Sequence, residues 1–249
     1  MYFLVDWWRR RQALREPFPE AWREILRRRV PFVARLDGEE RERFERKLLV
    51  FVRTKYFEGA RGMQIDDEVR VVIAAAAARL VMNLPDEHYA RLVEIIVYRS
   101  HMKHEHDPHV AVLGRAIGPG TVVLSWEAVL HGLADGADGL DTATHELAHA
   151  LDAADGDFDG TPDLATHAAY APWTEVMSEA YEKLRRKHRF ENRPVLRAYG
   201  ATNEAEFFAV ATEAFFEKPV QMRKRHPELY DVLKSYYRND PAAARDRRV

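Results

Sequence analysis

The stretch HELAH, residues 145–149, decides how this chain is interpreted, because two histidines four residues apart on a helix lie on one face. Both imidazoles could then reach one cation, and Glu146 could meet a metal-bound water beside it as general base. The competing interpretation is a surface helix with two solvated histidines. The neighbouring residues are apolar, however, and unliganded histidines in a buried helix would be costly. The stretch therefore predicts a zinc site in which His145 and His149 are ligands.

A catalytic zinc needs a third protein ligand and one open coordination position. Asp152 lies three residues after His149 and could ligate directly, but we favour a supporting role in which it orients an imidazole. Farther along, Glu206 and Glu213 are seven residues apart on an expected amphipathic helix and so share a face. Glu206 is followed by apolar residues, whereas Glu204 better fits an exposed acid near a helix N-terminus. The third ligand is therefore expected in this downstream segment.

Composition narrows the classes of function. The 249 residues include no cysteine, so any metal must be held by histidines and carboxylates, and a reducing cytoplasm is the expected location. Lys+Arg 38 against Asp+Glu 40 gives a formal charge of −2, which argues against nonspecific binding of nucleic acid. The N-terminal apolar run is about eight residues, too short for a membrane span of roughly 20. We expect Trp7, Trp8 and Arg9–Arg11 to pack on the domain rather than contact a membrane surface.

The hydrophobic pattern predicts an α+β fold, mainly helical with a small β-sheet. The first 85 residues are predicted to be helical. One helix begins at a capping box at Asp37, and another runs from Asp66 or Asp67 to Pro85. Leu92–Tyr98 and Gly120–Trp126 are β-branched, apolar and strand-like. Further helices are expected at about 171–188, 203–217 and 226–238. We expect a helical N-terminal region at 1–85, packed on the rest or forming a small lobe, a catalytic domain at 86–240 and a C-terminal tail at 241–249.

Two spaced blocks carry a family resemblance. One is HELAHALD (145–152) followed by G-D-x-D-G-x-P, and the other is a tyrosine, six residues, and E-x-F-A-V-x-T-E-x-F-F (199–216). With GTVVLSW before the first block, they resemble the Mlc titration factor A (MtfA) family of bacterial zinc peptidases. The resemblance runs from about Pro17 to about Pro241, and its specific motifs lie between Gly120 and Phe216.

The resemblance implies a zincin-like domain of gluzincin type, similar to the anthrax lethal factor protease domain, with one Zn²⁺ per chain. Carried over, Glu206 is the third ligand beside His145 and His149, and Glu146 is the general base. Tyr199 matches the family tyrosine thought to stabilise the oxyanion, a role that a phenol can fill by donating a hydrogen bond. Asp152 and Glu213 are expected to support the ligands.

The function predicted from these residues is hydrolysis of peptide bonds by a metal-activated water. A characterised family member binds a glucose-related repressor and shows aminopeptidase-like activity, so the alternative is a regulatory protein that mainly binds a partner such as a transcriptional repressor. A purely structural metal site is disfavoured, because three ligands plus Glu146 describe an open site.

Two other segments could bind metal. The histidines of the loop at 101–109 lack helical or strand spacing, so we favour a solvated loop near the cleft; they are His101, His104, His106 and His109. Asp155, Asp157 and Asp159 faintly resemble a calcium loop, but no glutamate closes it at the EF-hand spacing. A turn is therefore expected there.

Overall fold

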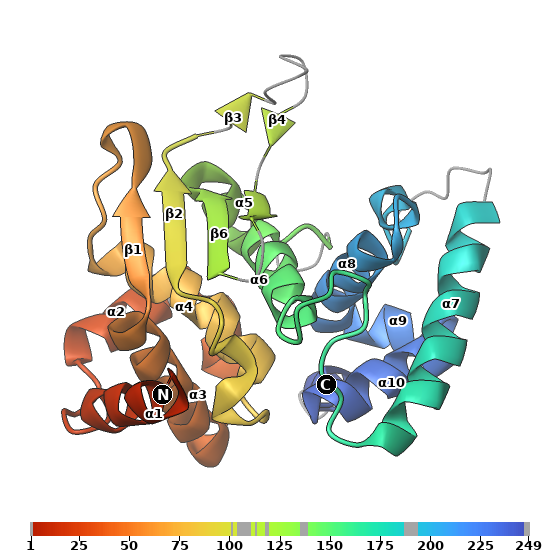
Figure 1. Cartoon of the computed structure of the whole chain (residues 1–249), viewed down its shortest axis with the longest axis horizontal. Helices are drawn as coiled ribbons and strands as arrows, with labels where there is room; N and C mark the ends of the chain where they lie inside the picture. Colours follow the sequence, from red (N-terminus) through yellow and green to blue (C-terminus); the bar gives the residue numbers. More distant parts are fainter. Residues whose placement is uncertain are drawn as a thin grey trace.

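A computed structural model describes residues 2–100, 102–103, 111–112, 114–117, 120–134, 139–186 and 194–246. The α+β prediction is confirmed, since helices dominate and a four-stranded sheet has the order β1-β2-β6-β5 (Figure 1). The helices are α1 (Tyr2–Ala13), α2 (Glu20–Arg29), α3 (Gly38–Thr54), α4 (Asp67–Val81), α5 (Trp126–Ala134), α6 (Thr142–Asp152), α7 (Tyr170–Arg186), α8 (Glu204–Glu217), α9 (Pro219–Arg225), α10 (Pro227–Tyr237) and α11 (Pro241–Asp246). The strands are β1 (Tyr56–Gly59), β2 (Glu94–Tyr98), β3 (Met102–Lys103), β4 (Ala111–Val112), β5 (Gly114–Ile117) and β6 (Thr121–Ser125).

Strands β1, β2 and β6 run parallel, and β5 pairs antiparallel with β6 at the edge. The parallel register pairs Ile95 with Phe57 on one side and with Val122 on the other. Ile95 and Val122 are fully buried, as expected for strands covered on both faces. A separate antiparallel ribbon is formed by β3 and β4.

The predicted capping box forms, and of the two residues expected to start the next helix Asp66 is the cap. Asp37 accepts a hydrogen bond from the Glu40 amide at 2.8 Å while the Glu40 side chain accepts from the Asp37 amide at 3.2 Å, which completes the capping box of α3. Asp66 caps α4, whose buried stretch includes every residue from Val71 to Ala78. Helix α4 ends at Val81, short of the expected end at Pro85, although Met82 still has helical φ and ψ; the proline itself restricts only the residue directly before it, Leu84.

Two expectations about local structure were wrong. The first 85 residues are not all helical, since Tyr56–Gly59 forms β1; a four-residue edge strand carries too little alternation to stand out in the sequence. Trp126 does not end a strand but begins α5, where the Ser125 hydroxyl accepts from the Ala128 amide at 3.3 Å. That bond is the N-cap pattern that serine favours.

The domain boundaries remain a prediction. The sheet contains β1 from the first 85 residues, and α4 packs against α6, so the two expected parts share packing. Within the expected C-terminal tail, Pro241–Asp246 forms α11, and Ala242 is fully buried. The loop at 101–109, with its four histidines, lies outside the described residues.

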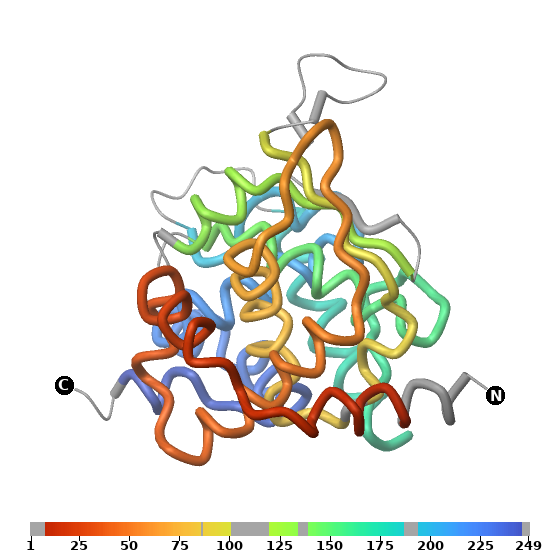
Figure 2. Tube along the Cα trace, turned by 90° about the vertical axis from the view of Figure 1, so that its left-hand side faces the viewer, coloured from red at the N-terminus to blue at the C-terminus, as the bar shows by residue number. Residues whose placement is uncertain are grey.

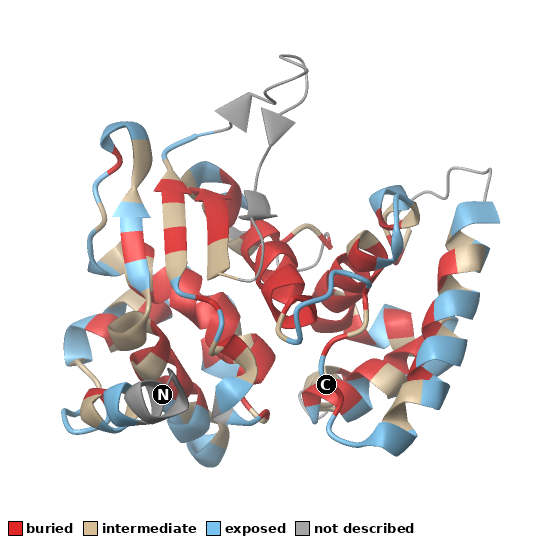
Figure 3. Ribbon diagram, viewed as in Figure 1, coloured by how far each residue is buried: buried red, intermediate tan, exposed pale blue. Residues whose placement is uncertain are grey.

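Helix α6 occupies the centre of the molecule. It packs against β5 and β6 on one side and against α8 on the other, and all of its residues are buried (Figures 1 and 3). Helices α1 to α3 lie at the lower left of Figure 1, below the strands, whereas α8 lies to the right of α6; Figure 2 views the molecule from the left-hand side. In the described part of the chain, no helix has the length and apolar character needed to cross a membrane.

Candidate functional site

Helix α6 holds the two histidines in a fixed frame. Its N-cap, Asp141, accepts from the Thr144 amide at 3.0 Å and from the Thr144 hydroxyl at 2.7 Å. One turn farther on, the rings of His145 and His149 lie 4.8 Å apart, centroid to centroid, and both side chains are buried. The spacing of four residues therefore does place both imidazoles on one face.

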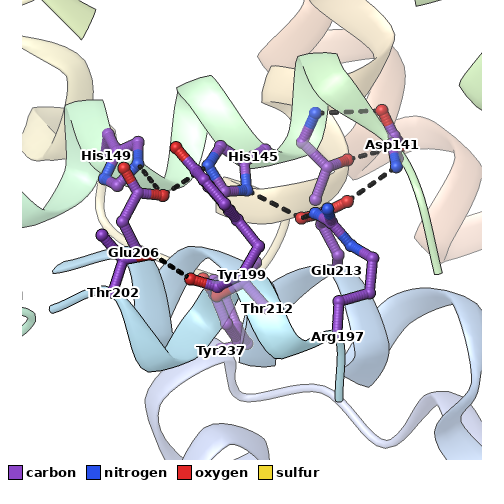
Figure 4. Close-up of polar contacts among 11 residues, drawn as sticks. Asp141, His145, His149, Arg197, Tyr199, Thr202, Glu206, Thr212, Glu213 and Tyr237 are labelled. Carbon is purple, nitrogen blue, oxygen red and sulfur yellow. Dashed lines mark hydrogen bonds and ion pairs between the residues drawn. The ribbon is translucent and has the colours of Figure 1, made fainter. Parts of the chain in front are cut away.

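Glu206 reaches these imidazoles from the first turn of α8. Asn203 caps that helix by accepting from the Glu206 amide at 2.8 Å. Glu206 Oε2 lies 2.9 Å from His145 Nε2 and 3.3 Å from His149 Nε2 (Figure 4). Among the described residues, these three form a group whose ligand atoms all lie within 4.8 Å of one another.

This donor set fits a tetrahedral zinc ion. Zinc ligands at about 2.0–2.1 Å in tetrahedral geometry stand roughly 3.3 Å from one another. The two distances from Glu206 Oε2, 2.9 and 3.3 Å, are close to that separation. Two imidazoles and one carboxylate also leave a fourth position open, as in catalytic zinc sites.

The electrostatics of His145 and Glu206 also favour a cation at this position. Burial alone would lower the pKa of His145, but the hydrogen bonds to Glu206 and Glu213 raise it to about 10. Burial would raise the pKa of Glu206, and the hydrogen bonds to the two histidines instead hold it far below its usual range. Without a metal, a proton on the imidazole therefore balances the carboxylate where a cation would otherwise lie.

Glu213 supports His145 from the opposite side of the ring. Its Oε1 lies 2.7 Å from His145 Nδ1, and its Oε2 accepts from the Asp141 amide at 2.8 Å. With one proton held on Nδ1 by this carboxylate, Nε2 faces Glu206: without a metal it carries the second proton, and with a metal it would offer its lone pair. Glu213 thus contacts both His145 and the N-terminus of α6.

Arg197 is a site residue that the sequence reasoning missed. Its Nη2 donates to Glu213 Oε1, and its guanidinium carbon lies 6.0 Å from the ring centroid of Tyr199. A carboxylate that is 1% exposed needs a compensating cation, but nothing in the sequence spacing says which of the Lys and Arg residues supplies it.

Asp152 contacts the loop after α6. It is fully buried, its Oδ2 accepts from the Gly160 amide at 3.0 Å, and burial raises its pKa to about 6. Within the described part of the chain, neither Asp152 Oδ1 nor His149 Nδ1 has a hydrogen-bond partner. The role expected for Asp152, orienting an imidazole, therefore remains a prediction.

Glu146 and Tyr199 complete the set predicted from the sequence. Glu146 follows His145 on α6 and is buried. Tyr199, in the turn Ala198–Ala201, is about half exposed, and its ring lies 5.9 Å from that of His145, toward which it points (Figure 4). Burial and the nearby Glu206 charge raise the pKa of Tyr199 to about 12, so the phenol keeps its proton at neutral pH.

A buried helix that presents two histidines to a glutamate of a second helix defines a metallopeptidase-like centre. Comparison with known proteins agrees: the chain belongs to the glucose-regulated metallo-peptidase M90 family, whose model matches residues 5–238. The resemblance to the MtfA family is thereby confirmed.

The relatives are similar over nearly their whole length. An uncharacterized protein of Synechocystis sp. is 35% identical over 245 residues, 94% of this chain and 89% of the relative. Mlc titration factor A of Klebsiella pneumoniae is 26% identical over 236 residues, covering 90% of this chain and 88% of its own. The protein of the same name from Serratia proteamaculans is 26% identical over 258 residues, covering 98% and 96%.

Proposed function

We propose that this chain is a zinc-dependent peptidase that hydrolyses peptide bonds, with one Zn²⁺ held by His145, His149 and Glu206. The observation that carries the proposal is the position of Glu206 Oε2, within 2.9 and 3.3 Å of the two Nε2 atoms. Membership of a metallopeptidase family supports it. The absence of cysteine fits a reducing compartment, so we place the reaction in the cytoplasm.

Each residue then has a role. When bound, zinc would lower the pKa of a water molecule toward 7 and polarise the substrate carbonyl. Glu146 takes the proton of the attacking water and returns it to the leaving amine. Tyr199 donates a hydrogen bond to the carbonyl oxygen as negative charge develops on it. Glu213 and Arg197 keep His145 in the tautomer that offers Nε2 to the metal.

Metal content and chelation test the proposal. The purified chain should contain about one zinc per chain, cleave members of a broad peptide library, lose that activity to a chelator and regain it with added zinc. Matched peptides with free and acetylated N-termini, in the same library, distinguish aminopeptidase from endopeptidase action. Cleavage that persists after complete removal of the metal would refute the proposal.

The second candidate function is binding of a transcriptional regulator, with hydrolysis secondary. It is favoured by one observation, the name Mlc titration factor A carried by several relatives. A chain that holds zinc, cleaves no library peptide and retains a regulator with micromolar or tighter affinity would support this function instead.

Tyr199→Phe tests the oxyanion role. Loss of the hydroxyl should lower kcat by about a hundredfold with little change in KM, because the bond forms only as charge develops. Zinc content should not change. Tyr56→Phe is the matched control, since Tyr56 is 60% exposed on β1, away from α6. Equal rates for Tyr199→Phe and the wild type would remove Tyr199 from the mechanism.

A further inference from the structure

The loop that follows α6 is fixed to both helices of the metal site. Asp152, the last residue of α6, accepts from the Gly160 amide. Gly160 has φ of +80° and is buried against α8, where an added Cβ would lie 2.5 Å from the Glu204 carbonyl oxygen. Only glycine fits that approach. The loop therefore has a defined position relative to His149 and Glu206.

Hydrogen bonds within the loop order its tip. The Asp157 amide donates to Asp155 Oδ1 at 3.0 Å, and the Thr161 amide donates to Asp159 Oδ1 at 2.9 Å. These are turns in which an aspartate side chain accepts from the backbone two residues on, as the sequence led us to expect. The backbone of the tip is thus supported without help from the side chain of Phe158.

Phe158 stands between these turns with its side chain toward the metal site. Its ring lies 5.9 Å from that of His149, centroid to centroid, and the residue is 43% exposed. One helical turn away, the ring of Tyr199 has the same separation from His145 and is 51% exposed. Two partly exposed aromatic rings therefore adjoin the two metal-binding imidazoles, one at each.

We infer that Phe158 forms the apolar wall of a substrate subsite and selects peptides with a large apolar side chain next to the bond that is cleaved. If the reacting carbonyl is held beside Tyr199 and His145, an adjacent side chain of the peptide would extend toward His149 and the ring of Phe158. Covering the exposed ring of Phe158 removes apolar surface of both partners from water. The inference rests on the proposed function and adds its substrate class.

Zinc-binding hydroxamates test the subsite without any need for turnover. Acetohydroxamate, N-acetylglycine hydroxamate and N-acetylphenylalanine hydroxamate are titrated into the zinc-loaded chain. The wild type should bind the phenylalanine compound about tenfold or more tightly than the glycine compound, the size of discrimination that apolar pockets achieve. In Phe158→Ala this preference should fall to about two- to threefold, with acetohydroxamate affinity and zinc content unchanged. Phe158→Leu should keep most of the preference.

Tyr56→Ala is the matched control, because it removes an exposed aromatic ring from β1, the edge strand farthest from β5, and should leave all three affinities as they are. A full phenylalanine preference in Phe158→Ala would overturn the inference. So would an equal loss of affinity for zinc and for all three hydroxamates, since Phe158 would then only pack against His149. If acetohydroxamate does not bind the zinc-loaded wild type, the open metal site itself is refuted, and the proposed function fails with the subsite.

Discussion

Glu146→Gln should abolish peptide hydrolysis while the chain keeps about one zinc ion. Glutamine has nearly the same size as glutamate and still accepts hydrogen bonds, but it cannot take a proton from water. General-base catalysis contributes about 10²- to 10⁴-fold, so kcat should fall by at least about a hundredfold. Single-turnover rates on one library peptide, with zinc measured on the same sample, check the prediction.

The matched control is Glu204→Gln, which makes the same chemical change on an exposed acid in the first turn of α8. Its rate should stay within about twofold of the wild type, as for surface positions away from the chemistry. Undiminished hydrolysis by Glu146→Gln would end the general-base assignment. A loss of zinc together with activity would instead make Glu146 part of the metal site.

The sequence was sufficient to predict that both histidines lie on one face of their helix, because residues four apart on an α-helix always share a face. It also predicted the capping box at Asp37 and a helix start at Asp66 or Asp67, of which Asp66 is the cap, since capping is a local interaction between residues three apart. Choosing Glu206 over Glu213 as ligand required the family resemblance, because acids seven apart share a face and either could have reached the histidines. In the structure Glu206 faces the Nε2 atoms and Glu213 faces Nδ1 of His145.

Other parts of the site and fold depend on contacts between distant segments. The pairing of β1 with β2 joins Phe57 to Ile95, and no local pattern in a four-residue strand specifies that partner. Arg197 acts on His145 only through Glu213, so its role depends on tertiary packing that brings three separate elements together. Long-range charge compensation of this kind leaves no periodic signature in a sequence.

The difference between Glu206 and Glu213 leads to a prediction with two opposite effects. Glu206→Ala should weaken zinc binding by more than about a hundredfold, since it removes a direct ligand, whereas Glu213→Ala should weaken it by about 10- to 100-fold, as for supporting residues. Competition with a coloured zinc chelator measures both affinities.

Stability of the metal-free protein should follow the reverse order. The Glu213 side chain is 1% exposed and its partners are the Asp141 amide, His145 and Arg197, so Glu213→Ala leaves a mostly buried guanidinium without its carboxylate. Removing one partner of such a pair costs about 3–5 kcal/mol. The Glu206 side chain is 18% exposed, and its removal leaves His145 still paired with Glu213, so the loss of its contacts should cost less, about 1.5–3 kcal/mol. Urea unfolding of the metal-free variants measures the difference. If Glu213→Ala lost more zinc affinity and Glu206→Ala lost more stability, the ligand and its support would have to exchange roles.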